Sequence, residues 1–210
     1  IANTMYPQVV TLFRQNPNNP DLGPQINKLV FHFKEAVRID STYATSLNNL
    51  GSVYLNFYRD YPKAVRYCEK AITYDTNYVE ARFNSAFSYN ALGDFDQSIY
   101  HLKNIIEVKP NYLKAYELLG KVLKGNGKVD EGIIMLEELA IKSEEPKTIY
   151  VAIGNLISAK GESHYPQALD YFVKAFEYDH NDKALCNHIV KLCTRLGKPG
   201  IANKHMVFCN

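Results

Sequence analysis

Apolar and small side chains recur along this chain three or four positions apart, with polar residues between them. In TSLNNLGSVYLNF, for example, Leu47, Leu50, Gly51 and Tyr54 fall on one face of a helix. The segments ARFNSAFSYNALG, AYELLGKVLKGNG and IYVAIGNLISAKG repeat this spacing. No segment alternates between apolar and polar residues in the way that a half-buried strand does. The pattern predicts an all-α protein.

A turn and a second helix follow each of these first helices. Glycine marks the turns at Gly93, Gly127 and Gly161. The second helix carries small or apolar residues at i, i+4 and i+7, as YPKAVRYCEKA shows. Its closing residue recurs in steps of 35, 34, 34 and 36 along the chain, at Ala36, Ala71, Ile105, Leu139 and Ala175. Because a single helix pair leaves one apolar face uncovered, this period predicts a stack of helix pairs.

The repeated unit resembles the tetratricopeptide repeat (TPR), whose period is about 34 residues. LNNLGSVY and YELLGKVL match its first helix, NALGDFDQSI matches its turn, and EVKPNYLKA carries the closing proline as Pro110. The resemblance implies a right-handed superhelical solenoid of antiparallel helix pairs. It also implies a concave groove that is lined mainly by the first helix of each pair.

The repeats divide the chain into three parts of one solenoid domain. Residues 1–40 are expected to hold an N-terminal helix, a Pro-rich loop at 16–24 and a partial repeat. Four TPR-like repeats follow at 41–181, with boundaries of about 41–77, 78–111, 112–145 and 146–181. Residues 182–210 are expected to form a divergent fifth repeat or capping helices.

Small residues and insertions add two structural expectations. Gly51, Gly120 and Gly154 are expected to let the first helix of a pair approach the second, so Gly120→Leu should overpack the pair and destabilise it by roughly 1–3 kcal/mol. The first unit has one extra residue and the fourth has two, directly before Tyr61-Pro62 and Tyr165-Pro166. Proline is tolerated in the first turn of a helix, so both dipeptides should start second helices after lengthened turns that protrude.

Composition limits the classes of partner. With 24 basic and 22 acidic residues the net charge is +2, which gives no electrostatic argument for nucleic acid or an anionic membrane. No stretch approaches 18 apolar residues, so direct membrane insertion is not expected. The chain begins Ile-Ala-Asn without an initiator methionine or signal peptide, so we expect a processed form or an excised piece.

Residues that could carry chemistry do not form a recognisable set. The four cysteines have no disulfide-framework spacing and are expected to be reduced. Zinc would need about four ligands in a tetrahedral array, and the C-terminal cysteines and histidines are divided among different helix faces. The remaining histidines are scattered, acidic pairs fall at helix starts or solvated faces, and no Gly-rich phosphate loop is present. We therefore expect a non-enzyme with no catalytic residue, metal or cofactor.

The register of the first helices selects groove positions. An asparagine amide both donates and accepts, so it can pair with a peptide backbone whatever the peptide's side chains. In some related superhelices a ladder of asparagines holds a peptide, and here the equivalent slots read Asn49, Asn84, Leu118, Ala152 and Asn187, which breaks the ladder in the middle. The partner-binding candidates are Asn48, Asn49, Ser52, Phe83, Asn84, Phe87, Lys114, Glu117, Leu118, Lys121, Asn155 and Asn187. The wider register adds Asn56, Glu80, Asn90, Lys124, Val151, Ala152, Ser158, Lys183 and Val190.

These positions allow two more specific interpretations, a carboxylate clamp and an apolar patch, besides simple packing between helices. Of the carboxylate clamp by which chaperone-binding relatives hold a C-terminal aspartate, only Asn84 and Lys114 match, so a full clamp is not expected. Phe83, Phe87 and Leu118 could form an apolar patch flanked by lysines, or could be buried between neighbouring first helices. Asn84→Ala and Lys114→Ala are expected to weaken partner binding with little loss of stability.

The function that this reading favours is a non-catalytic protein–protein interaction scaffold that binds a peptide or partner protein in its concave groove. One alternative is an accessory TPR domain of a larger membrane-attached enzyme or transport or assembly complex. The other is a self-assembling scaffold, that is, a homo-oligomer. The expected location is a soluble domain in the cytoplasm or periplasm, or part of a larger membrane-associated chain.

Overall fold

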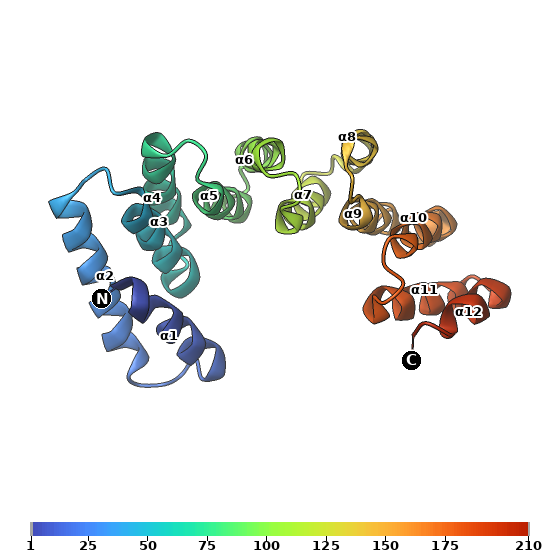
Figure 1. Ribbon diagram of the computed structural model, residues 1–210, viewed down its shortest axis with the longest axis horizontal. Helices are drawn as coiled ribbons and strands as arrows, with labels where there is room; N and C mark the ends of the chain where they lie inside the picture. The colour runs from blue at the N-terminus through green and yellow to red at the C-terminus, as the bar shows by residue number, and fades with distance from the viewer. Residues whose placement is uncertain (1, 210) are drawn as a thin grey trace. The chain divides into compact units, whose positions relative to one another are not determined.

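The computed structural model describes residues 2–209, and in this range it contains twelve α-helices and no strand (Figure 1). The helices follow one another as antiparallel pairs, which confirms the all-α class predicted from the hydrophobic period. They form two compact units, Ile1–Val108 and Lys109–Asn210, which we call unit 1 and unit 2 and describe separately.

Unit 1 contains three helix pairs and a core that runs between them. The pairs are α1 (Ala2–Gln15) with α2 (Leu22–Ile39), α3 (Ala44–Val53) with α4 (Tyr61–Tyr74), and α5 (Val79–Leu92) with α6 (Phe95–Val108). Val9 of α1 is buried with Leu29 and Phe33 of α2, so the chain begins with a helix pair of its own. The Pro-rich loop is shorter than predicted, because α2 starts at Leu22 and includes Pro24 in its first turn, where a missing N–H is harmless.

A buried polar cluster joins the last three helices of unit 1. His101 of α6 is 2% exposed, and its Nε2 donates to Glu69 Oε1 of α4 at 3.1 Å. The Ser85 hydroxyl of α5 donates to the same oxygen at 2.5 Å. Burial alone would raise the pKa of Glu69, but the hydrogen bonds from His101 and Ser85 outweigh it and leave that pKa below its ordinary value. The Tyr89 ring stacks on His101, with centroids 5.6 Å apart.

Unit 2 also contains three helix pairs. They are α7 (Leu113–Gly125) with α8 (Val129–Lys142), α9 (Lys147–Ser158) with α10 (Tyr165–Glu177), and α11 (Lys183–Arg195) with α12 (Pro199–Met206). Fully buried aliphatic and aromatic residues fill the layer between them, among them Leu119, Leu136, Ile153 and Phe172.

The glycines in the first helices are not equivalent. A Cβ built on Gly51 would lie 2.3 Å from Cys68 Sγ, and one on Gly154 would lie 2.7 Å from the Phe172 ring. Both positions therefore hold the two helices of a pair in close approach, as predicted. Gly120 does not, because a Cβ there would meet only Ala152 Cβ of α9, at an ordinary 3.7 Å. The prediction that Gly120 lets α7 approach its own partner helix is wrong, since no atom of α8 lies within 4 Å of that Cβ.

The first and fourth repeats accommodate their extra residues in different ways. In the first repeat, Tyr54–Tyr58 forms one π-helical turn that continues α3, and Arg59 ends this turn in the left-handed conformation with φ 51°. The insertion thus lies inside the helix and the turn before α4 is short, contrary to the predicted protrusion. In the fourth repeat a 3₁₀ helix, Glu162–His164, contains the extra residues. Pro62 and Pro166 lie in the first turns of α4 and α10, as predicted.

The C-terminal segment folds back on unit 2. Cys209 forms a disulfide with Cys186 of α11, so the prediction that all four cysteines are reduced is wrong for this pair. A sequence separation of 23 residues did not indicate the bond, because it depends on α12 returning along α11. The Phe208 ring packs on Phe176 of α10 at 5.8 Å between centroids. Cys68 and Cys193 remain buried thiols.

Candidate functional site

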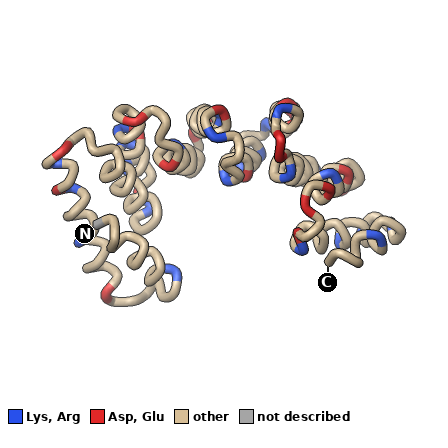
Figure 2. The backbone as a smooth tube through the Cα atoms, in the orientation of Figure 1, with Lys and Arg blue, Asp and Glu red and all other residues tan. Residues whose placement is uncertain are grey.

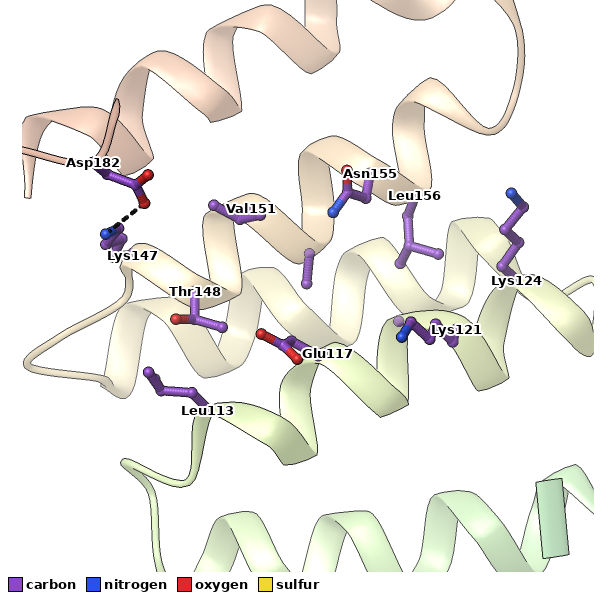
Figure 3. Close-up of a pocket in the computed structure, with 12 residues that line it drawn as sticks. Leu113, Glu117, Lys121, Lys124, Lys147, Thr148, Val151, Asn155, Leu156 and Asp182 are labelled. Carbon is purple, nitrogen blue, oxygen red and sulfur yellow. Dashed lines mark ion pairs between the residues drawn. The ribbon is translucent and has the colours of Figure 1, made fainter. Parts of the chain in front are cut away.

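A pocket of about 660 Å³ lies between α7 and α9 in unit 2 (Figure 3). Helix α7 supplies side chains spaced three or four residues apart, which places them on one face of the helix. Helix α9 supplies the opposite wall, and Asp182, at the N-terminus of α11, reaches one end. The lining residues are Leu113, Glu117, Gly120, Lys121, Lys124, Lys147, Thr148, Val151, Ala152, Asn155, Leu156 and Asp182.

Small and apolar residues form part of the wall of the pocket. Gly120 of α7 faces Ala152 of α9, and the missing side chain at Gly120 leaves the space between the two helices open. Ala152 is 6% exposed and Leu156 is 2% exposed, so both belong to the packed interior as well as to the pocket wall. Val151 is half-buried beside them. This surface is firm because core packing fixes it.

One end of the pocket is closed by an ion-pair network. Lys147 Nζ lies 2.6 Å from Asp179 Oδ2 and 2.8 Å from Asp182 Oδ2. Burial alone would lower the pKa of Lys147, but its bonds to the two aspartates raise it. The hydrogen bond from Lys147 lowers the pKa of Asp179. Burial acts to raise the pKa of Asp182, yet the bonds from Lys147 and the Leu185 N–H lower it overall. The lysine charge at this end is therefore fully compensated.

The other end carries two lysines without a direct ion pair among the described residues, and Glu117 lies one helical turn before Lys121. Lys121 and Lys124 are exposed at the end of the pocket away from Lys147 and Asp182 (Figure 3). Within residues 2–209, no carboxylate lies within 4 Å of either ammonium group. Asn155, exposed on α9, adds an amide that can both donate and accept. Elsewhere acidic and basic residues are interspersed along the helices (Figure 2).

The sequence-based candidates in unit 2 fall into different environments. Glu117, Lys121 and Asn155 line the pocket together. Lys114 is exposed on α7 but does not line it. Leu118 is 5% exposed and packs in the interior. Asn187 is exposed on α11 and its amide donates to the Lys183 carbonyl of its own helix at 2.8 Å.

The polar candidates in unit 1 bond mainly to one another. The Asn84 amide of α5 donates to Asn48 Oδ1 and to Ser52 Oγ of α3, both at 2.9 Å. Asn48 and Ser52 are 5% and 7% exposed. Asn49 donates to Asn3 Oδ1 of α1 at 2.9 Å. These side chains join neighbouring first helices, and the donors of the Asn84 amide are already used.

The two aromatic candidates lie on α5 in unit 1. Phe87 is 41% exposed, whereas Phe83 is half-buried. Leu118, with which they were grouped in sequence, is an interior residue of unit 2.

Several pocket residues were absent from the sequence-based set. Lys147 and Asp182 lie at the starts of α9 and α11, where the register of the first helices gives no signal. Asp182 had one usable signal, because aspartate is a favoured N-cap, and its carboxylate accepts from the Leu185 N–H at 2.9 Å. Gly120 was assigned to packing within a pair. The others not foreseen are Leu113, Thr148 and Leu156.

Two features of other protein classes are missing from the described range, residues 2–209. No group of three or more histidine, cysteine, aspartate or glutamate side chains is placed to hold a metal ion there. None of the helices in that range combines the length and apolar character needed to span a bilayer.

Comparison with known sequences gives one short match. No family model matches the chain. The anaphase-promoting complex subunit 3 of Schizosaccharomyces pombe is 29% identical over 94 residues, which make up 45% of this chain and 14% of that protein. The chain therefore spans only a small part of this curated relative.

Comparison with solved structures gives long matches. MamA aligns with a TM-score of 0.59 and 22% identity, over 75% of this chain and 90% of its own. A tetratricopeptide repeat protein from Parabacteroides merdae aligns with a TM-score of 0.58 and 16% identity, over 96% and 84%. YrrB, described as a TPR protein with an unusual peptide-binding site, aligns with a TM-score of 0.51 and 14% identity, over 84% and 90%.

These identities are low, so the likeness concerns the fold. It agrees with the helix pairs seen in both units and with the repeat period of the sequence. This chain has the helical solenoid fold of the tetratricopeptide repeat proteins.

Proposed function

We propose that the chain is a non-catalytic protein-interaction module that holds an extended peptide segment of a partner protein in the pocket between α7 and α9. The observation that carries this proposal is the pocket itself. Its volume of about 660 Å³ falls in the range typical of binding sites, roughly 300–1,000 Å³.

The lining suits a peptide. Gly120, Ala152 and Leu156 offer a surface on which a small apolar side chain can be buried. Asn155 and Thr148 offer polar groups at the side of that surface, which a peptide backbone can use. Binding sites usually combine apolar surface with a few directional polar groups, and this pocket differs in that five of its twelve lining residues are charged.

The similar proteins support the same class of function. YrrB shares the fold and its description names a peptide-binding site, and the curated relative is named as a subunit of a complex. Stacked helix pairs create extended binding surfaces in repeat proteins generally. An interaction role is therefore the function that the fold and the pocket favour together.

A peptide selection tests the proposal. A phage library displaying random dodecapeptides is selected on the wild-type chain, and enriched peptides are then measured on Gly120→Leu by fluorescence anisotropy. The backbone at this position accepts a Cβ, which would meet only Ala152 Cβ at an ordinary 3.7 Å, and the rest of the leucine side chain is expected to occupy the pocket. Gly23→Leu is the matched control, since a Cβ there meets nothing within 4 Å and Gly23 lies on α2, outside the pocket.

The outcomes separate cleanly. Enriched peptides should bind the wild type and Gly23→Leu alike, and should lose at least about tenfold in affinity on Gly120→Leu, a change of about 1.4 kcal/mol. Selection of no peptide, or equal binding by both glycine variants, would contradict the assignment of this pocket.

A further inference from the structure

The lysines of the pocket differ in whether their charge is already used. Lys147 is held between Asp179 and Asp182, at 2.6 and 2.8 Å. Lys121 and Lys124 have no carboxylate within 4 Å among residues 2–209. An anionic group that enters the pocket therefore finds available ammonium groups only at the Lys121 and Lys124 end.

The opposite end repels an anion. There the two aspartates outnumber the single Lys147, and Glu117 lines the pocket between the ends (Figure 3). The pocket thus has a negative end and a positive end along its length. Like charges brought together at an interface are costly, so such an arrangement fixes the direction of a charged ligand.

The length of the pocket limits the size of the bound segment. Its wall on α7 runs from Leu113 to Lys124, which corresponds to about 16 Å at 1.5 Å per helical residue. Extended chain covers about 3.3–3.6 Å per residue, so about five residues fit. Gly120, Ala152 and Leu156 form an apolar surface that reaches the Lys121 end of the pocket, where a single small side chain would sit (Figure 3).

We infer that the partner segment is acidic: an internal stretch of about five extended residues whose aspartate or glutamate side chains bind Lys121 and Lys124, with a small aliphatic residue over Gly120. This inference rests on the proposed function and names the chemistry of its partner. Two ammonium groups three residues apart on one helix face match a pair of acidic side chains better than the single carboxylate of a chain terminus. Nucleic acid fits less well, because Glu117 and Asp182 also line the pocket.

The test compares two selections and then measures single peptides. The same random dodecapeptide library, displayed so that its C-terminus is joined to the coat protein, is selected on the wild-type chain and on the double variant Lys121→Gln/Lys124→Gln. Enriched peptides are synthesised with an amidated C-terminus, and a second version replaces every Asp and Glu by Asn and Gln. Lys142→Gln is the control, since Lys142 is exposed on α8 and does not line the pocket.

Peptides from the wild-type selection should be enriched in Asp and Glu next to a small aliphatic residue. Their neutral versions should bind about tenfold more weakly at low salt, and the gap should narrow at high salt. The double variant should remove that gap, while Lys142→Gln should retain it.

Other results would overturn the inference in recognisable ways. If neutral and acidic versions bind equally but Gly120→Leu abolishes both, the peptide-binding function stands and the acidic preference is wrong. If no peptide is selected, the proposed function fails and this inference with it. A fluorescein-labelled oligothymidine that binds more tightly than the peptides and depends on Lys121 and Lys124 would replace the acidic peptide by nucleic acid. Binding that requires a free C-terminal carboxylate would also overturn it.

Discussion

The first helices of the repeats carry polar residues at predicted groove positions in both units, but the two units use them differently. In unit 1 the Asn84 amide is consumed by Asn48 and Ser52 at 2.9 Å, so polar groups knit neighbouring helices together. In unit 2, helices α7 and α9 enclose a pocket of about 660 Å³, where neither Lys121 nor Lys124 has a carboxylate within 4 Å among the described residues. A side chain at a predicted groove position is therefore available to a ligand only where neighbouring side chains do not already bind its polar or charged group.

The largest expected effect concerns the cross-link that holds the end of unit 2. The Cys186–Cys209 disulfide should stabilise this unit by about 2–4 kcal/mol, because it restricts the unfolded chain. Dithiothreitol should lower the midpoint of thermal unfolding of the wild type. Cys209→Ser should start from the lower midpoint and show no further response. Mass spectrometry after alkylation under denaturing conditions must show two reactive thiols before reduction, and finding four would contradict the bond.

A pair of glycine substitutions tests whether the first helix is packed more tightly at Gly51 in unit 1 than at Gly120 in unit 2. Gly51→Leu in unit 1 must displace Cys68, whose Sγ would lie 2.3 Å from the new Cβ, and should cost about 1–3 kcal/mol or more. Gly120→Leu in unit 2 has only a 3.7 Å contact and should change stability by less than about 1 kcal/mol. Urea unfolding of the two variants measures the difference. Equal losses would show that α7 is packed as tightly as α3.

The asparagines test the same contrast through hydrogen bonding. Asn84→Ala removes the donor to Asn48 Oδ1 and Ser52 Oγ, and should cost about 1–3 kcal/mol because these acceptors are buried. This replaces the sequence-based expectation of little loss of stability. Asn155→Ala, on an exposed position, should stay within about 0.5 kcal/mol and instead weaken selected peptides. Chemical unfolding measures the stability of both variants, and fluorescence anisotropy measures their affinity for selected peptides. If Asn84→Ala leaves the free energy of unfolding unchanged, the structural role of Asn84 is wrong.

The smallest expected effect is the pH dependence that Glu69 contributes in unit 1. The pKa of Glu69 is lower in the folded chain than its unfolded value of 4.5, so its carboxylate stabilises the fold above that pH. The stabilisation is lost as the pH falls through the lower, folded pKa. Glu69→Gln should therefore unfold at a lower temperature than wild type at pH 7, and the two should converge as the pH falls through the folded pKa of Glu69. If the difference in unfolding temperature persists at acid pH, it arises from the shape of the side chain at position 69 and not from its charge.

Much of the fold follows from the sequence, and the reasons are local. The helical spacing of residues such as Leu47, Leu50 and Tyr54, and the return of small residues every 34 to 36 positions, predict stacked helix pairs. Proline in the first turns of α4 and α10 was predicted from its missing N–H. Glu117, Lys121 and Asn155 were placed in a groove by register, and the structure brings them to one pocket.

The features that could not be predicted depend on contacts between distant elements. Gly51 contacts the second helix of its own pair, whereas Gly120 faces the first helix of the next pair. The sequences around the two glycines are similar, so they did not reveal this difference. The inserted residue before Tyr61 could enter a turn or the helix, and it forms a π turn.

The repeating helix pair follows from the chain alone, because side-chain spacing and small residues act within one period. The tertiary packing selects which polar groups are already bonded. It paired Asn84 with Asn48 and Ser52, joined Cys186 to Cys209, and surrounded Lys147 but not Lys121 or Lys124 with carboxylates. Hydrogen bonds and ion pairs act over a few ångströms, so their partners are fixed by the stacking of neighbouring pairs.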